Sequence, residues 1–144
     1  MTNGLTREPV GSDFRRHVLW QKAQAFAAEL VGLATQLPRD RASDVIGTQL
    51  LRAGASIAAN IAEGYGRYSQ AAYRNHLSIA RGSAFETESW LDLLARRGYL
   101  TSKQSEELIS RCTEVQKLLT VRMKSLSEGK SYAVKEEAPL YAPE

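Results

Sequence analysis

The chain has 144 residues, of which 43% are hydrophobic and 24% charged, and its formal net charge is +3. This is the size and composition of one globular domain, and the mild positive charge permits an anionic partner without requiring one. The single cysteine, Cys112, excludes an intramolecular disulfide and a multi-cysteine metal site.

Neither a secretory signal nor a membrane span is expected. The first 16 residues are polar throughout and contain no apolar signal core. No apolar run approaches the roughly 20 residues that are needed to cross a bilayer. We therefore expect a cytoplasmic protein with no membrane partner.

Hydrophobic periodicity predicts two helices in the first half of the chain. The first covers about residues 18–36, and Pro38 stops it. The second covers about residues 43–63. Gly64 and Gly66 follow it, and we expect both to adopt the positive φ that commonly ends a helix.

Two further helices are predicted in the second half. The third begins at Ser69, a good N-cap, and runs to about Arg97, with Gly98 in the position that commonly follows a helix. The fourth begins with Thr101 and Gln104, which have the spacing of a capping box.

The short connections between these helices predict an all-α fold, an antiparallel up-down-up-down four-helix bundle over residues 14–128. The fourth helix is expected to end at Gly129. Residues 1–13 and 129–144 show no periodicity, so we expect them to form flexible terminal segments.

Several sequence blocks resemble a known family. They include residues 60–64 (Asn-Ile-Ala-Glu-Gly), residues 79–83 (Ile-Ala-Arg-Gly-Ser), residues 19–23 and residues 98–100. In these blocks the chain resembles bacterial four-helix-bundle proteins first described as encoded in intervening sequences of 23S rRNA genes. Their relatives include the accessory variability proteins of diversity-generating retroelements. The resemblance covers about residues 14–126.

The resemblance implies a homo-oligomer, usually a pentamer arranged as a ring. The retroelement relatives imply RNA, DNA or a reverse transcriptase-like protein as a partner, while most members have no assigned activity. The chain departs from the usual pattern at Leu51, where an arginine is frequent, and this lowers the basic charge on that face.

Arginines near the predicted helix ends are the candidate nucleic-acid contacts, because clustered cations can follow a phosphate backbone. These residues are Arg15, Arg16, Arg39, Arg41, Arg67, Arg74, Arg96 and Arg97. No aromatic residues are clearly placed among them, so we expect electrostatic binding with weak sequence selectivity.

A second set of charged residues is more simply explained by ion pairs within the bundle or between subunits, since arginine pairs readily with carboxylates at interfaces. This set consists of Arg52, Glu63, Arg81, Glu86 and Glu88.

A third set is polar and lies among small residues. Ser56 and Asn60 are one helical turn apart, and Ser83 on the next helix is a suitable partner. A binding pocket is one interpretation. We favour a hydrogen-bonded polar core that fixes the helix register, because buried polar groups are normally satisfied inside the fold.

No catalytic constellation is recognisable. The two histidines, His17 and His76, do not form the Glu-x-x-His motifs of a di-iron bundle. We expect no metal, no cofactor and no enzymatic activity. The leading hypothesis is a homo-oligomeric scaffold that binds RNA, DNA or a nucleic-acid-handling protein. The alternative is a structural or protein-interaction oligomer without nucleic-acid affinity.

Overall fold

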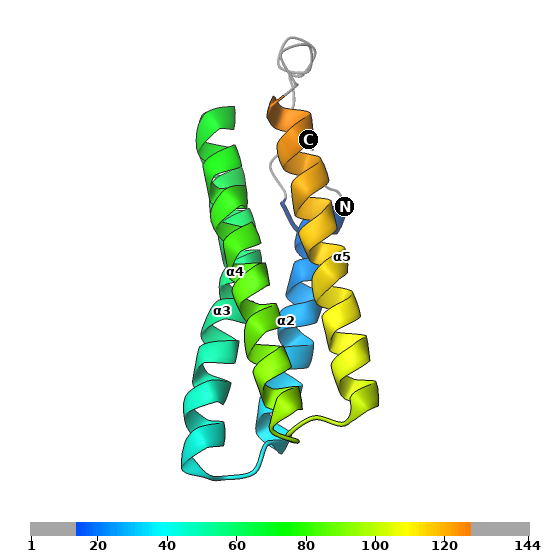
Figure 1. Ribbon diagram of the computed structural model, residues 1–144. Coiled ribbons are helices and arrows are strands. Elements are labelled where there is room, and N and C mark those ends of the chain that lie inside the picture. The colour runs from blue at the N-terminus through cyan, green and yellow to red at the C-terminus, as the bar shows by residue number, and fades with distance from the viewer. Residues whose placement is uncertain (1–13, 128–144) are drawn as a thin grey trace, which may run out of the picture.

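The computed structural model describes residues 14–127, in which helices joined by short connections are the regular structure and no strand is present. The long helices lie side by side, as Figure 1 shows. This confirms the prediction of an all-α protein with four helices. The elements are the short 3-10 helix η2 (Phe14–Arg16) and the helices α2 (Val18–Gln36), α3 (Arg41–Tyr65), α4 (Gln70–Arg96) and α5 (Ser102–Ser127).

Some predictions concern residues outside this range. The expected terminal segments, 1–13 and 129–144, and the expected helix end at Gly129 all lie beyond the described residues. None of the helices in the described part is long and apolar enough to span a lipid bilayer.

The helices α3 and α4 begin at side chains that cap the backbone. The carboxylate of Asp40 accepts a hydrogen bond from the backbone N–H of Ser43 at 2.7 Å, so α3 starts slightly before the predicted residue 43. The hydroxyl of Ser69 accepts from the N–H of Ala72 at 3.0 Å, as its prediction as an N-cap requires. Both caps satisfy N–H groups that have no partner inside the helix.

The connection between α4 and α5 also follows the sequence. Gly98 has a φ of +80°, the left-handed conformation that glycine adopts at low cost. The N–H of Thr101 donates to the Gln104 side chain at 2.8 Å, and the N–H of Gln104 donates to Thr101 Oγ1 at 3.1 Å. These reciprocal bonds form the predicted capping box.

The prediction for Gly64 and Gly66 is wrong. Gly98 is the only glycine with positive φ in residues 14–127, and Gly66 has a φ of −81°. Gly64 is instead required by packing. A Cβ added there would lie 2.6 Å from the Cβ of His76 and 3.2 Å from the backbone oxygen of Tyr73. The glycine lets α3 and α4 approach closely.

The core fills the space between the four helices. Small residues of α3 bring it close to α2 as well, since a side chain at Gly54 would overlap that of Leu30. The large side chains that are fully buried come from all four helices: Phe26, Leu30, Leu50, Ile57, Leu77, Leu91, Leu94, Val115 and Leu119. Together with the smaller buried residues between them, they recur mostly every three or four residues along each helix, which explains the periodicity of the sequence.

The connections between the helices lie at two ends of the molecule. Figure 1 shows the α2–α3 and α4–α5 connections at one end and the α3–α4 connection at the other. The Tyr99 hydroxyl donates to Asp40 Oδ2 at 3.0 Å and so links the first two connections directly. We call the part formed by residues 37–41 and 96–103 the loop end.

Candidate nucleic-acid interface

The loop end brings together four of the candidate arginines. Arg39 and Arg41 come from the α2–α3 connection and the first residue of α3, while Arg96 and Arg97 come from the end of α4. All four side chains are exposed. The hydrogen bond between Tyr99 and Asp40 holds the two segments in place. It also raises the pKa of Tyr99, so the donating hydroxyl stays protonated well above neutral pH.

Most of these cations have no acidic partner. Arg96 pairs with Asp92, one turn earlier on α4, at 2.6 Å. No ion pair within residues 14–127 involves Arg39, Arg41 or Arg97. Within residues 37–41 and 96–103 the cations outnumber the single carboxylate, Asp40, so the loop end carries a net positive charge.

The remaining candidate arginines lie at the opposite end. Arg15 and Arg16 belong to η2. The next residue, His17, contacts the ring of Tyr65 at the end of α3, with 4.7 Å between the centroids, and this places η2 near that end. Arg67 and Arg74 flank the start of α4, and Arg67 pairs with Glu63 at 2.6 Å.

The eight candidates therefore do not form one patch. The 25 residues of α3 separate the two groups by about 37 Å, at roughly 1.5 Å per residue.

The three residues of the predicted polar core lie between α3 and α4. The Ser56 hydroxyl is 2.6 Å from the Ser83 hydroxyl, and the Asn60 amide donates to the backbone oxygen of Ser56 at 2.8 Å. The Asn60 side-chain oxygen lies 3.2 Å from Nδ1 of His76, a partner that sequence reasoning missed. All four side chains are half-buried. We call them the α3–α4 polar seam.

An ion pair between α3 and α4 lies next to the α3–α4 polar seam, on the side nearer the loop end. Arg52 on α3 pairs with Glu86 on α4 and donates to Gln49 at 2.9 Å. Glu86 also accepts from the Trp90 indole at 3.0 Å. The hydrogen bond from Trp90 and the pairing with Arg52 lower the pKa of Glu86. Because the ion pair connects α3 with α4, we assign Arg52 and Glu86 a structural role.

Arg81 and Glu88 form no ion pair within residues 14–127, and the expected pairing between subunits stays a prediction. Arg81 donates to the Thr120 hydroxyl at 2.8 Å and lies over the ring of Phe85, 4.9 Å from its centroid. Glu88 accepts from the Gln116 amide at 2.7 Å. Both residues face α5, because a spacing of seven places them on one side of α4. Their partners there are the uncharged polar side chains of Thr120 and Gln116 on α5.

The surroundings of Cys112 do not favour a reactive thiol. Cys112 is fully buried and its thiol contacts the backbone oxygen of Ala84 at 3.1 Å. Burial raises its pKa to about 12, so the nucleophilic thiolate is suppressed. Across residues 14–127, no three His, Cys, Asp or Glu side chains are grouped to hold a metal ion.

Comparison with known proteins agrees with the resemblance noted in the sequence. A solved structure from Bacteroides thetaiotaomicron, described as a protein with unknown function from the S23 ribosomal protein family, is 40% identical with a TM-score of 0.71. The match covers 74% of this chain and 99% of that one. No curated protein matches the chain significantly. Residues 15–121 match one family profile, and the chain belongs to the 23S rRNA-intervening sequence protein family.

Proposed function

We propose that the chain is a non-enzymatic scaffold that assembles with copies of itself and binds RNA through the loop end. The observation that carries this proposal is the cluster of Arg39, Arg41 and Arg97, which have no ion pair within the described residues. Arginines without acidic partners remain available for phosphate, which they bind through two parallel hydrogen bonds. The family name refers to 23S rRNA, which makes RNA the first nucleic acid to test.

Assembly is the second part of the proposal. The exposed surface of α4 includes large apolar side chains: Ile79 and Phe85 are each 46% exposed, about 120° apart around the helix, and Leu93 at 36% lies between them. Such a face is suited to contact with another copy. We propose antiparallel helix neighbours within each copy, in agreement with the alternating connections in Figure 1, and a closed ring of copies.

A ring would strengthen binding without any new contact. Each copy would place its loop end on the same rim, so the three arginines would be repeated around it. The local positive potential then grows with the number of copies, and a long RNA can engage several clusters at once. In such a ring the net charge of +3 per chain would be multiplied by the number of copies.

Charge reversal at the two ends of the molecule tests the RNA part. The variant Arg39→Glu/Arg97→Glu alters the loop end, and Arg16→Glu/Arg74→Glu alters the other end by the same charge. All four side chains are exposed and have no ion pair in the described part of the chain, so both variants should fold. Fluorescence anisotropy with a labelled 20-nucleotide RNA at 50 mM salt measures the affinity.

We expect the loop-end variant to bind at least about tenfold more weakly than the wild type and the control variant to change little. Equal losses in both variants would show that the net charge matters and the loop end does not. Circular dichroism and light scattering will check whether both variants keep the helical content and the assembly of the wild type.

A second candidate function is a protein-interaction oligomer without nucleic-acid affinity. The exposed apolar face of α4 favours it, since such a face serves assembly whether or not RNA binds. Wild-type protein that is oligomeric yet binds neither RNA nor DNA at 50 mM salt would support this candidate and remove the first.

A further inference from the structure

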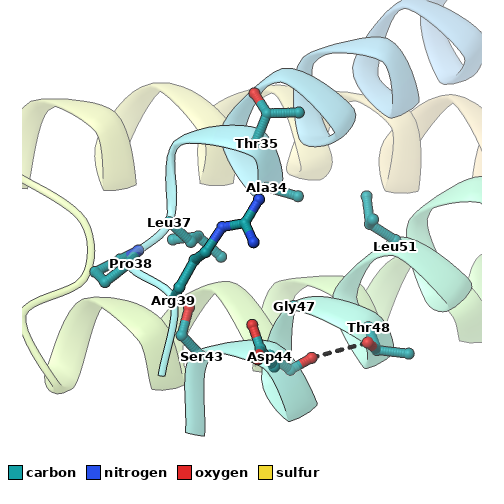
Figure 2. Close-up of a pocket in the computed structure, with 10 residues that line it drawn as sticks. All are labelled: Ala34, Thr35, Leu37, Pro38, Arg39, Ser43, Asp44, Gly47, Thr48 and Leu51. Carbon is teal, nitrogen blue, oxygen red and sulfur yellow. Dashed lines mark hydrogen bonds between the residues drawn. The ribbon is translucent and has the colours of Figure 1, made fainter. Parts of the chain in front are cut away.

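A cavity of about 370 Å³ opens between the end of α2 and the start of α3, at the loop end (Figure 2). Its size is within the usual range for small-ligand sites, roughly 300–1,000 Å³. One part of its lining is apolar: Ala34, Leu37, Pro38, Gly47 and Leu51. The other part is polar: Thr35, Arg39, Ser43, Asp44 and Thr48.

Two opposite charges in this lining have no partner. Figure 2 shows the Arg39 side chain extending over the cavity toward α2, and Asp44 lies in the first turn of α3. Neither side chain forms an ion pair or a hydrogen bond within residues 14–127, and they are not paired with each other. A ligand of this cavity should therefore offer hydrogen-bond donors to the Asp44 carboxylate. It should also offer a flat face or a negative charge to the Arg39 guanidinium.

The wall also contains a buried polar atom that lacks a partner. Ser43 is 2% exposed, and its hydroxyl makes no hydrogen bond within the described residues. Buried hydroxyls are normally satisfied, so the Ser43 hydroxyl calls for a partner such as a water molecule or a ligand in the cavity. This observation is independent of the charges of Arg39 and Asp44.

Gly47 leaves the cavity open although packing does not demand a glycine there. A Cβ at this position would meet only Leu37 Cδ1, at an ordinary distance of 3.4 Å. Glycine inside a helix is less favourable than alanine. Unlike Gly64, which a neighbouring helix requires, Gly47 keeps a space free.

From these observations we propose that the cavity binds one unstacked guanine base of single-stranded RNA. The proposal rests on the proposed RNA binding of the loop end. Guanine presents two adjacent donors, N1–H and N2–H, which match the two oxygens of the Asp44 carboxylate. The planar Arg39 guanidinium stacks on one face of the base, as arginine does with unstacked bases. The apolar wall with Leu37 and Leu51 covers the other face.

The same charges disfavour other ligands. The Asp44 carboxylate repels a free phosphate or sulfate, and the Arg39 guanidinium repels a metal cation. Uracil presents a single N–H between two carbonyl oxygens, which face the carboxylate unfavourably. Binding at the loop end should therefore combine sequence-independent phosphate contacts with a preference for guanine at one nucleotide.

Labelled heptanucleotides test this preference by anisotropy at 50 mM salt. The probes are seven uridines, the same strand with a central guanosine, and the same strand with a central inosine, which lacks the N2 amino group. Wild-type protein should bind the guanosine strand about tenfold more tightly than the uridine strand, with inosine between them.

Two variants alter the cavity by independent means. Gly47→Leu fills it, and Asp44→Asn replaces the carboxylate while keeping the shape. Both should abolish the guanosine preference and leave the affinity for seven uridines within about threefold of the wild type, because no arginine is changed. The control Ala28→Leu adds similar bulk at an exposed position of α2 outside the cavity lining, and it should keep the preference.

The outcomes separate the two proposals. If wild-type protein binds both strands equally, or if the preference survives in both cavity variants, the base-binding site is refuted while the RNA-binding proposal stands. If wild-type protein binds no strand at all, both are refuted. Circular dichroism and light scattering will check whether Gly47→Leu keeps the fold and assembly of the wild type. Asp44→Asn gives the same test without added bulk.

Discussion

Replacing Gly64 with alanine should destabilise the protein, although alanine is the better helix former. The new Cβ would lie 2.6 Å from the Cβ of His76, and 3.1 Å and 3.2 Å from the Tyr73 ring and backbone oxygen. The His76 Cβ and the Tyr73 backbone are fixed parts of α4, so the clash is relieved only if α4 shifts. Overpacking of this kind costs about 1–3 kcal/mol, and the helix propensity of alanine returns at most about 1 kcal/mol.

The net loss should therefore be about 1 kcal/mol, and at most about 2 kcal/mol, in the free energy of unfolding. For a domain of this size, a loss of about 1 kcal/mol corresponds to a fall of about 4 °C in Tm. Thermal and urea denaturation followed by circular dichroism measure both quantities.

Gly82→Ala is the matched control, because a Cβ at Gly82 meets nothing within 4 Å in the middle of α4. This variant should gain about 0.5–1 kcal/mol. The two substitutions are chemically identical and should have opposite signs. A Gly64→Ala protein as stable as Gly82→Ala would refute the close approach of α3 and α4 at this residue.

The further predictions concern the α3–α4 polar seam, the Cys112 thiol and the assembly. Asn60→Ala removes the partner of the Ser56 carbonyl and of His76, so the free energy of unfolding should fall by about 1–2 kcal/mol with helicity unchanged; an unaltered melting temperature would contradict this. Cys112 should resist a disulfide reagent at pH 8 until denaturant is added, and rapid native-state reaction would show that the thiol is accessible. The pKa of Cys112 is about 12 in the folded protein, above the ordinary 9.0. The contribution of this thiol to stability is therefore complete below pH 9 and is lost as pH rises toward 12, because the unfolded chain then releases the thiol proton more readily. Cys112→Ala should reduce this loss of stability. Light scattering should give a multiple of the 15.9 kDa chain mass, and a monomer at micromolar concentration would refute assembly.

The helix boundaries could be predicted where local interactions set them. The cap of Ser69 and the capping box of Thr101 and Gln104 each involve residues within one turn, so the sequence contains both partners. The role of Gly64 could not be predicted in this way. Two residues of another helix, Tyr73 and His76, determine it, and their approach depends on how α3 and α4 pack.

Contacts between helices were harder to predict, because they depend on rotation and register. Ser56 and Ser83 do lie together, but the expected acidic partners of Arg81 are absent from its surroundings in the described residues. The cavity at the loop end was not predicted at all. Gly47 was its one signal, since a glycine inside a helix, away from any turn, indicates a packing or functional reason.

The proposed RNA binding is tested most directly by its dependence on salt. The affinity of wild-type protein for a labelled RNA is measured between 50 and 200 mM salt, with the oligomer mass monitored throughout. If about six phosphates are engaged by the repeated loop ends, affinity should fall on the order of 10²- to 10³-fold over this range. No detectable binding at 50 mM salt, or an affinity that salt leaves unchanged, would contradict the proposed role of Arg39, Arg41 and Arg97.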